Sequence, residues 1–354
     1  MGNVPVRDFF VAQTVTPDNL PFAMDPFTNM LKSVAPPSCA LALLVLVAAG
    51  YAGDATAGRT ASLETDMLEV VIADNDAYGP EHRAGYNGVS ELRLKSGNQK
   101  NLFVPSYAGL NFEHIFSGDA ASFGWNIFEP RRARMQVIRL ADNKVELRQE
   151  RTEHWPLRSR LVYELKGDAI DFTCFGTPLE DAWKKHGYIG VFFASYIQAP
   201  EDMSIQFIGR SRPGRGDTRP RWIKHLPEKH GVAANHRPAG SNWDPLLDDG
   251  FNIDLVKGIS DLEYLYPFYF GRSGENVLVL MFGKTGEDGE LRFAQSPSGG
   301  GKGNPAWDFV YFRRDYAVGR EFSFRARALY RKFTSAEAVA RLYEEWSGEK
   351  VILP

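Results

Sequence analysis

Glu113 and His114 lie side by side in the most unusual stretch of the chain, Gly-Leu-Asn-Phe-Glu-His-Ile-Phe at 109–116. Polar groups among large apolar residues need partners, and they acquire shifted pKa values there. Glu and His are also the usual acid and base side chains of enzymes. We therefore predict Glu113 and His114 as catalytic residues and Asn111 as a binding residue. The alternative is a structural pair that satisfies its own hydrogen bonds. A regular strand would place Asn111 and Glu113 on one face and His114 on the other.

A second set of polar residues lies along the long apolar strand expected at 187–198. His186, Tyr188 and Tyr196 all have even numbers, so they share one face if no bulge intervenes. A face of His and Tyr can bind a ligand, and we predict His186 as catalytic and both tyrosines as binding residues. A core whose hydroxyls reach solvent is the alternative.

The stretch 124–132 combines an aromatic plane with two guanidinium groups. Trp125 can stack on a sugar ring, and Arg131 and Arg132 can grip carboxylates. We predict Trp125 and Arg132 as binding residues. The alternative is a loop with a buried Trp and surface charges.

An aromatic run at 263–272 ends in Gly271 and Arg272. Five aromatic residues in ten positions exceed what core packing requires, so we predict Tyr269 and Arg272 as binding residues, with Trp307 further along the chain. We expect His114, His186 and Arg272 to line one cavity, because a curved sheet brings central strands together on its concave face.

Alternating apolar and polar residues predict many strands and no βαβ rhythm. The expected strands are 67–73, 89–95, 101–105, 134–140, 144–150, 158–165, 169–175, 187–198, 203–208, 276–282, 290–295, 307–313 and 320–330. Asp, Asn and Gly between paired segments, at 141–143 and 166–168, predict tight hairpins. This pattern predicts an all-β fold, a large antiparallel β-sandwich of two stacked sheets.

One convincing helix is expected, at 334–347. Thr334-Ser335-Ala336-Glu337 reads as a capping box, and Gly348 ends the helix. The segment 209–262 is poor in apolar periodicity and is expected to be a long loop, either functional or partly disordered. We expect residues 58–354 to form a single β-sandwich domain.

The N-terminal region has the order of features of a secretory signal peptide. Lys32 precedes an uncharged apolar run at 39–49, and small residues at Ala52 and Ala57 follow it. The run is shorter than the roughly 20 residues that span a membrane. We expect export to the periplasm or the exterior with cleavage near Ala52 or Ala57, so that no stable membrane span remains. Met24 and Met30 are both placed to be the translation start, as alternatives to Met1.

Composition excludes several classes of protein. The 354 residues include 41 basic and 44 acidic side chains, a net charge of −3, so no global field holds nucleic acid. Cleavage after Ala57 would leave Cys174 alone, which excludes an intrachain disulfide and a cysteine-based zinc site. His225, His230 and His236 lack a metal spacing. We expect no metal and no cofactor, and the sequence is silent on the oligomeric state.

The order of elements resembles the galactose-mutarotase-like supersandwich. More narrowly, 101–105, 109–116, 186–197 and 304–309 resemble a group of uncharacterised secreted proteins from polysaccharide-degrading bacteria. The resemblance implies a sugar bound on a concave sheet, and supersandwich epimerases typically use a His acid and a Glu base there.

These observations predict a secreted carbohydrate-active protein, with acid–base chemistry at a sugar carbon if it is an enzyme. A lyase would use Tyr or His as base, with Arg or Asn steadying the anion. A hydrolase would need two opposed carboxyls, for which Glu113 and Glu263 are the best pair; an epimerase is the third option. The alternatives are a non-catalytic carbohydrate-binding protein and a structural envelope protein.

Overall fold

The structure is a computed structural model that describes residues 59–76, 85–97, 99–120 and 125–354. The first half of the described chain contains β1 (Thr60–Glu64), β2 (Leu68–Ala73), β3 (Gly88–Leu94), β4 (Asn111–Phe116), the 3-10 helix η2 (Trp125–Phe128), α1 (Glu129–Arg132), β5 (Gln136–Ala141), β6 (Lys144–Gln149), β7 (Leu157–Lys166), β8 (Ala169–Pro178) and β9 (Ile189–Ala194). The second half contains β10 (Ile205–Ser211), β11 (Arg221–His225), β12 (Asn235–Pro238), α2 (Asp254–Lys257), β13 (Ile259–Tyr264), β14 (Phe268–Ser273), β15 (Asn276–Phe282), β16 (Gly289–Ser296), β17 (Ala306–Arg313), β18 (Phe322–Lys332) and α3 (Ala336–Ser347).

Fifteen strands form one sheet in the order β4-β9-β17-β16-β12-β13-β10-β14-β15-β18-β8-β7-β6-β5, with β11 paired to β10. The pairings recorded in the described chain are antiparallel, except that β12 runs parallel to β13. Strands β1, β2 and β3 form a smaller sheet. The predicted all-β fold is confirmed, and so are the hairpins between β5 and β6 and between β7 and β8.

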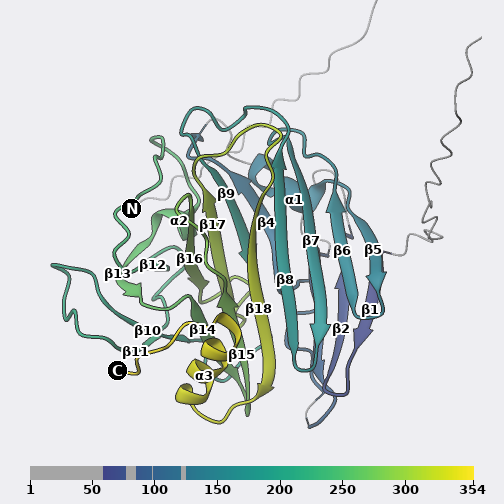
Figure 1. The fold of residues 1–354 in the computed structure, drawn as a ribbon, viewed down its shortest axis with the longest axis vertical. Coiled ribbons are helices and arrows are strands. Elements are labelled where there is room, and N and C mark those ends of the chain that lie inside the picture. The colour runs from purple at the N-terminus through teal and green to yellow at the C-terminus, as the bar shows by residue number, and fades with distance from the viewer. Residues whose placement is uncertain (1–58, 77–84, 98, 121–124) are drawn as a thin grey trace, which may run out of the picture. The chain divides into compact units, whose positions relative to one another are not determined.

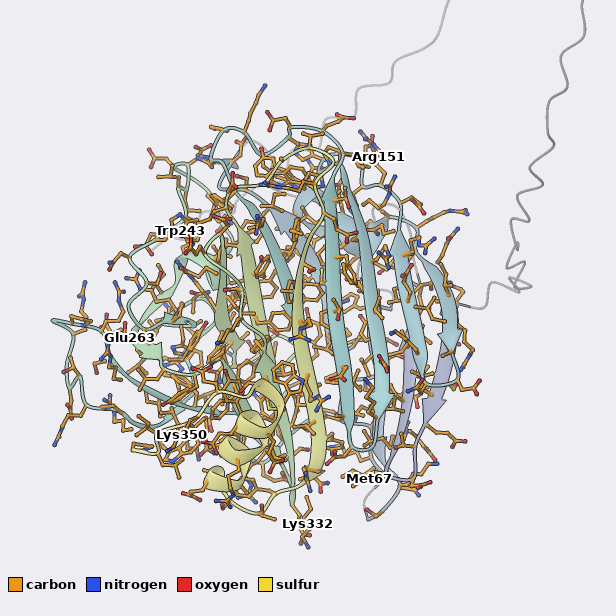
Figure 2. The ribbon with its side chains drawn as sticks, viewed as in Figure 1. Met67, Arg151, Trp243, Glu263, Lys332 and Lys350 are labelled. Atoms are coloured by element: carbon orange, nitrogen blue, oxygen red, sulfur yellow. The ribbon has the colours of Figure 1, made fainter. Side chains whose placement is uncertain are left out.

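The large sheet folds back on itself to make two layers. The ring of Phe324 on β18 lies 5.6 Å from Phe193 on β9 and 5.9 Å from Phe309 on β17. The layer of β18, β8 and β7 therefore covers the layer of β4, β9 and β17 (Figure 1). Apolar side chains from alternate positions of both layers form the central core between them. Figure 2 shows the side chains on the ribbon.

The outer face of the β4, β9 and β17 layer carries a second apolar cluster. It contains Tyr188, Phe192 and Tyr196 from the region of β9, and Val310 and Phe312 from β17. Residues from 251 to 256, around α2, pack over part of this face. The candidate site described below lies on this outer face.

Three expectations from the sequence need correction. Residues 101–105 do not form a strand and contribute only an isolated bridge from Phe103 to Ile197. The segment 209–262 is not one long loop, because it contains β11, β12, α2 and β13. The cap of α3 is Ser335, whose Oγ accepts a hydrogen bond from the backbone N–H of Ala338, and not Thr334.

The described residues contain no helix that is long and apolar enough to cross a membrane. The apolar run at 39–49 and the expected cleavage sites lie outside the described residues.

Candidate functional site

A β-bulge in β4 puts Glu113 and His114 on the same side of the sheet. Phe112 pairs with Phe193 and His114 pairs with Phe192, so Glu113 is the extra residue between two consecutive partners. The alternation expected from the sequence, with Glu113 and His114 on opposite faces, is therefore wrong at this point. Because Glu113 is an extra residue in the strand, the side chain of His114 points to the same side as that of Glu113. Phe112 and Ile115 still face the central core.

Arg131 reaches the same place from the short helix α1. Its Nε donates to Asn111 Oδ1 at 2.8 Å, and Asn111 Nδ2 donates to the backbone oxygen of Asn87 at 2.7 Å. The flat face of the guanidinium lies 3.7 Å from the ring centre of Tyr86. Arg131 is only 3% exposed, so these contacts hold its charge in a fixed position.

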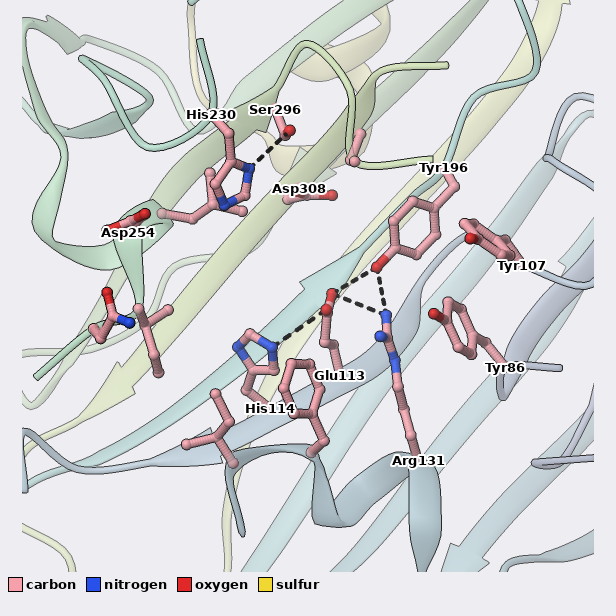
Figure 3. A pocket seen from close by; sticks show the side chains of 17 residues that line it. Tyr86, Tyr107, Glu113, His114, Arg131, Tyr196, His230, Asp254, Ser296 and Asp308 are labelled. Carbon is pink, nitrogen blue, oxygen red and sulfur yellow. Dashed lines mark hydrogen bonds and ion pairs between the residues drawn. The ribbon is translucent and has the colours of Figure 1, made fainter. Parts of the chain in front are cut away.

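Glu113 is the centre of a buried polar network (Figure 3). One carboxylate oxygen, Oε2, lies 3.0 Å from Arg131 Nη2 and accepts a hydrogen bond from the Tyr196 hydroxyl at 2.9 Å. The other, Oε1, lies 3.2 Å from His114 Nε2. The Tyr196 hydroxyl also accepts a hydrogen bond from Arg131. One acid, one imidazole, one guanidinium and one phenol thus meet on the outer face.

The network opens on a cavity of about 260 Å³. Its walls combine aromatic rings with polar groups from elements far apart in the sequence. The lining residues are Tyr86, Tyr107, Glu113, His114, Ile127, Phe128, Arg131, Tyr196, His230, Asn252, Ile253, Asp254, Leu255, Ser296, Gly299, Ala306 and Asp308. His230 and Ser296 hydrogen-bond to each other, with His230 Nδ1 3.0 Å from Ser296 Oγ, on the side of the cavity across from Glu113 (Figure 3).

The environment lowers the pKa of both the Glu113 carboxyl and the His114 ring. Burial alone would raise the pKa of Glu113, but Arg131, His114 and Tyr196 together lower it to about 2. Burial lowers the pKa of His114, although Glu113 opposes that shift. Near neutral pH, Glu113 is therefore a carboxylate and His114 an uncharged imidazole.

Asp308 is a second carboxyl in the cavity, with the opposite behaviour. It lies on β17, is 1% exposed, and accepts a hydrogen bond from the backbone N–H of Ser195 at 3.0 Å through Oδ1. Burial, reinforced by the nearby charge of Glu113, raises the pKa of Asp308 well above its usual range. Burial also raises the pKa of Tyr196 well above its usual range. In both groups the surroundings favour the protonated form.

The structure brings together three of the residues predicted from the sequence and places a fourth behind them. Glu113, His114 and Tyr196 line the cavity. Asn111 lies behind Arg131 and orients it. Trp125 belongs to η2, and its side chain lies outside what the structure describes.

His186 and Tyr188 do not line this cavity. Tyr188 shares the outer apolar cluster with Tyr196, as the even numbering predicts. However, the two tyrosines flank opposite ends of β9, about 26 Å apart along an extended chain at 3.3 Å per residue. His186 Nε2 lies 3.1 Å from Asp248 Oδ1, and the Tyr188 hydroxyl donates to the backbone oxygen of Leu246 at 3.1 Å. Sharing a face did not bring these residues to the same site.

Tyr269, Arg272 and Trp307 also lie elsewhere, so the expected cavity of His114, His186 and Arg272 does not form. Tyr269 and Trp307 belong to the central core, where Tyr269 donates to the backbone oxygen of Asp308 at 3.1 Å. Arg272 lies on β14, 4.7 Å from the ring centre of Phe333. These residues belong to the interior and to the other layer.

At two positions the sequence analysis predicted a binding residue, but the residue next to it in the sequence lines the cavity. Arg132 does not line the cavity, whereas the adjacent Arg131 does; the direction of each side chain from α1 decided this. Trp307 faces the core, so the next residue, Asp308, faces the cavity by strand alternation. That signal was available once β17 was assigned. Nothing in the local sequence pointed to Tyr86, Tyr107 or His230.

The described residues contain no group of three or more His, Cys, Asp or Glu side chains placed to hold a metal ion. Cys174 is buried in the central core.

No protein-family model and no curated protein matches this chain. Solved structures do match. A galactose mutarotase-like protein from Lactobacillus casei is 13% identical, covers 77% of this chain and 100% of its own, and has a TM-score of 0.39. An alpha-N-acetylgalactosaminidase from Bifidobacterium bifidum is 10% identical over 81% of this chain and 38% of its own, with a TM-score of 0.41. A heparan sulfate lyase from Pedobacter heparinus is 9% identical over 80% of this chain and 38% of its own, with a TM-score of 0.39.

Galactose mutarotase-like proteins are thus among the structures to which this chain is similar, as the order of elements predicts. The chain spans less than half the length of the galactosaminidase and of the lyase. The chemistry proposed below rests on the residues of this chain.

Proposed function

We propose that the cavity binds a single sugar ring and catalyses acid–base proton transfer on it. The observation that carries the proposal is the buried network of Glu113, His114, Arg131 and Tyr196 on the wall of an aromatic-lined cavity. A network of this kind has a desolvation cost, and clefts with perturbed acids and bases are candidates for catalysis.

The size and the walls of the cavity suit a small, polar and partly flat ligand. Its volume of about 260 Å³ lies just below the roughly 300–1,000 Å³ of pockets for drug-sized ligands. The rings of Tyr86 and Tyr107 lie 4.8 Å apart, and that of Tyr107 lies 5.0 Å from the ring of Tyr196. Aromatic rings with hydroxyl tips offer both an apolar surface and hydrogen bonds, as a pyranose requires.

His114 is the proposed base. The Glu113 carboxylate facing Nε2 favours the tautomer with the proton on Nε2, which leaves the lone pair on Nδ1. Among the described residues, neither ring nitrogen of His114 makes a hydrogen bond, so Nε2 is held by its 3.2 Å ion-pair contact with Glu113 and Nδ1 is unpaired. The ring is held between Phe192, at 5.2 Å, and Phe128, at 4.7 Å between centroids. A neutral, oriented imidazole with a free lone pair accepts a proton from the sugar.

Asp308 is the proposed acid. Its raised pKa favours the protonated carboxyl, and among the described residues only Oδ1 has a hydrogen-bond partner, the Ser195 amide. A site that holds an uncharged base and a protonated acid in one cavity can remove one proton from a sugar and add another.

This arrangement favours an epimerase-type reaction over hydrolysis. A retaining hydrolase needs a free carboxylate as nucleophile. Glu113 instead directs both oxygens to Arg131, Tyr196 and His114. Its role in the proposal is to orient His114 and to steady the positive charge that the ring gains when it accepts a proton.

The test is turnover of reducing sugars by the purified protein, followed by NMR of the anomeric protons and of hydrogen–deuterium exchange at carbon. His114→Gln keeps a donor close to the position of Nε2 and removes the base, so we expect the rate to fall about 100- to 10,000-fold.

His186→Gln is the matched control, because His186 also faces a carboxylate through Nε2 but at the other end of β9. Its rate should equal that of the wild type. The sequence-based hypothesis for His186 requires the opposite result, so the pair of variants decides between them. Sugar binding without turnover in the wild type would favour the non-catalytic alternative.

We further propose that the protein is exported. The support is the sequence at 32–57: a basic residue, a short apolar run and small residues, in that order.

A further inference from the structure

We propose that the cavity selects a sugar that carries no carboxylate or sulfate and discriminates against uronic acids. This inference rests on the proposed function, and it names the class of sugar that the site accepts. The support comes from the positions of the charged groups around the cavity.

Arg131 is the natural partner for an acidic sugar, but its binding edges are occupied. A guanidinium grips a carboxylate with two N–H groups, either Nε with Nη2 or Nη1 with Nη2. Nη2 of Arg131 already contacts Glu113 Oε2 at 3.0 Å and the Tyr196 hydroxyl, and Nε donates to Asn111 at 2.8 Å. Both forks include Nη2, so a substrate carboxylate could bind Arg131 through two N–H groups only by displacing Glu113.

Displacing Glu113 would be costly. The side chain of Glu113 is 12% exposed, so a carboxylate that lost Arg131 would remain buried without its cation. Breaking a buried ion pair by removing one partner is strongly destabilising. A ligand carboxylate gains at most what Glu113 loses, and the exchange therefore has no net driving force.

The rest of the described lining holds no other permanently charged cation, since it contains no lysine and no second arginine. It does hold three carboxyl groups, on Glu113, Asp254 and Asp308. Lys257 Nζ lies 3.5 Å from Asp254 Oδ1 and compensates part of the negative charge of Asp254. Asp308 is the protonated acid of the proposed function and Glu113 is paired with Arg131, so Asp254 supplies the charge that repels an anionic ligand. Repulsion inside a low-dielectric site is stronger than in water.

The uncharged hydroxyl groups of a sugar, in contrast, find hydrogen-bonding partners among the lining residues. Ser296 and Tyr107 line the cavity with hydroxyl groups that donate or accept without a net charge. Exchanging a carboxylate at the sixth carbon for a hydroxymethyl group removes the repulsion and keeps a hydrogen-bonding group.

The experiment measures the dissociation constants of matched pairs that differ only at the sixth carbon: galactose with galacturonic acid, and glucose with glucuronic acid. Titration calorimetry or NMR titration at pH 7 and low salt should show at least tenfold weaker binding of each acid. Raising the salt concentration should narrow the ratio, because salt screens repulsion.

Asp254→Asn should also narrow the ratio between the two dissociation constants, because it removes the opposing charge. Asp261→Asn is the control, since Asp261 is an exposed carboxylate outside the cavity lining, and it should leave the ratio unchanged. If the acidic sugars bind as tightly as the neutral sugars or more tightly, the proposed selectivity is wrong, but the proposed function still stands. If no member of either pair binds, the proposed function is itself wrong, and the selectivity falls with it.

Discussion

At the residue scale, the site depends on the compensation of one buried negative charge. Glu113 would be destabilising in an apolar cluster without partners. Arg131, Tyr196 and His114 supply those partners, and Asn111 holds Arg131 in place from behind. The same contacts that stabilise the carboxylate leave His114 neutral and oriented. The stability of the fold and the proposed chemistry therefore share one set of atoms.

This sharing predicts how stability depends on pH. The pKa of Glu113 in the folded state, about 2, lies below the ordinary value of 4.5, so its contribution is present above about pH 4.5 and is lost as the pH falls towards 2. The shift corresponds to about 3 kcal/mol at most. Denaturant unfolding between pH 7 and pH 3 should show a smaller loss of stability for Glu113→Gln than for the wild type.

Glu345→Gln provides the comparison, because Glu345 is exposed on α3. It should follow the wild-type curve. An identical acid dependence in all three proteins would show that the Glu113 carboxylate is not the group responsible.

At the element scale, short elements make the decisive placements. The bulge in β4 turns Glu113 and His114 to one side, and the four residues of α1 present Arg131 to them. The helix α3 has a different role, since Val339, Ala340 and Tyr343 pack it against the outer side of β14 and β15. Gly348 ends this helix at a φ of 71°, a backbone conformation that favours glycine.

The cap of α3 gives a test at this scale. Ser335→Ala should lower the free energy of unfolding by about 1 kcal/mol, because it removes the oxygen that accepts from the Ala338 amide at 3.1 Å. Thr334→Ala should change it much less, since Thr334 is exposed and lies one residue before the cap. Equilibrium unfolding of both variants measures the difference. A larger effect at Thr334 would restore the assignment expected from the sequence.

At the scale of the whole molecule, the fold makes a cavity on the outside of a sandwich. The central core joins the two layers through aromatic contacts such as that of Phe193 with Phe324. The outer face of β4, β9 and β17 is then free to carry the site, and the loops around η2 and α2 build walls over it. The core and the site use opposite faces of the same strands.

Export is tested on the whole chain. N-terminal sequencing of the protein recovered from its native cells should begin near Gly53 or Gly58, because cleavage after Ala52 or Ala57 follows the apolar run. Cleavage after Ala57 would leave 39 basic residues (41 − 2) and 40 acidic residues (44 − 4). Recovery of the protein from the cytosol with Met1 retained would contradict export.

The sequence by itself determined the class of fold, most strands and the terminal helix. Alternation and turn residues are local signals, and they predicted pairings such as β7 with β8. The unusual polar residues of 109–116 identified Glu113 and His114 for the same local reason.

Only the tertiary structure decided which residues meet. Alternation places His186, Tyr188 and Tyr196 on one face, but distance along β9 separates the first two from the cavity. A bulge is a one-residue change of register that depends on the partner strand, so the sequence of β4 alone did not reveal it. Arg131 and Asp308 reach Glu113 from elements distant in sequence, because the folding of the sheet, and not any local pattern, brings α1 and β17 to β4.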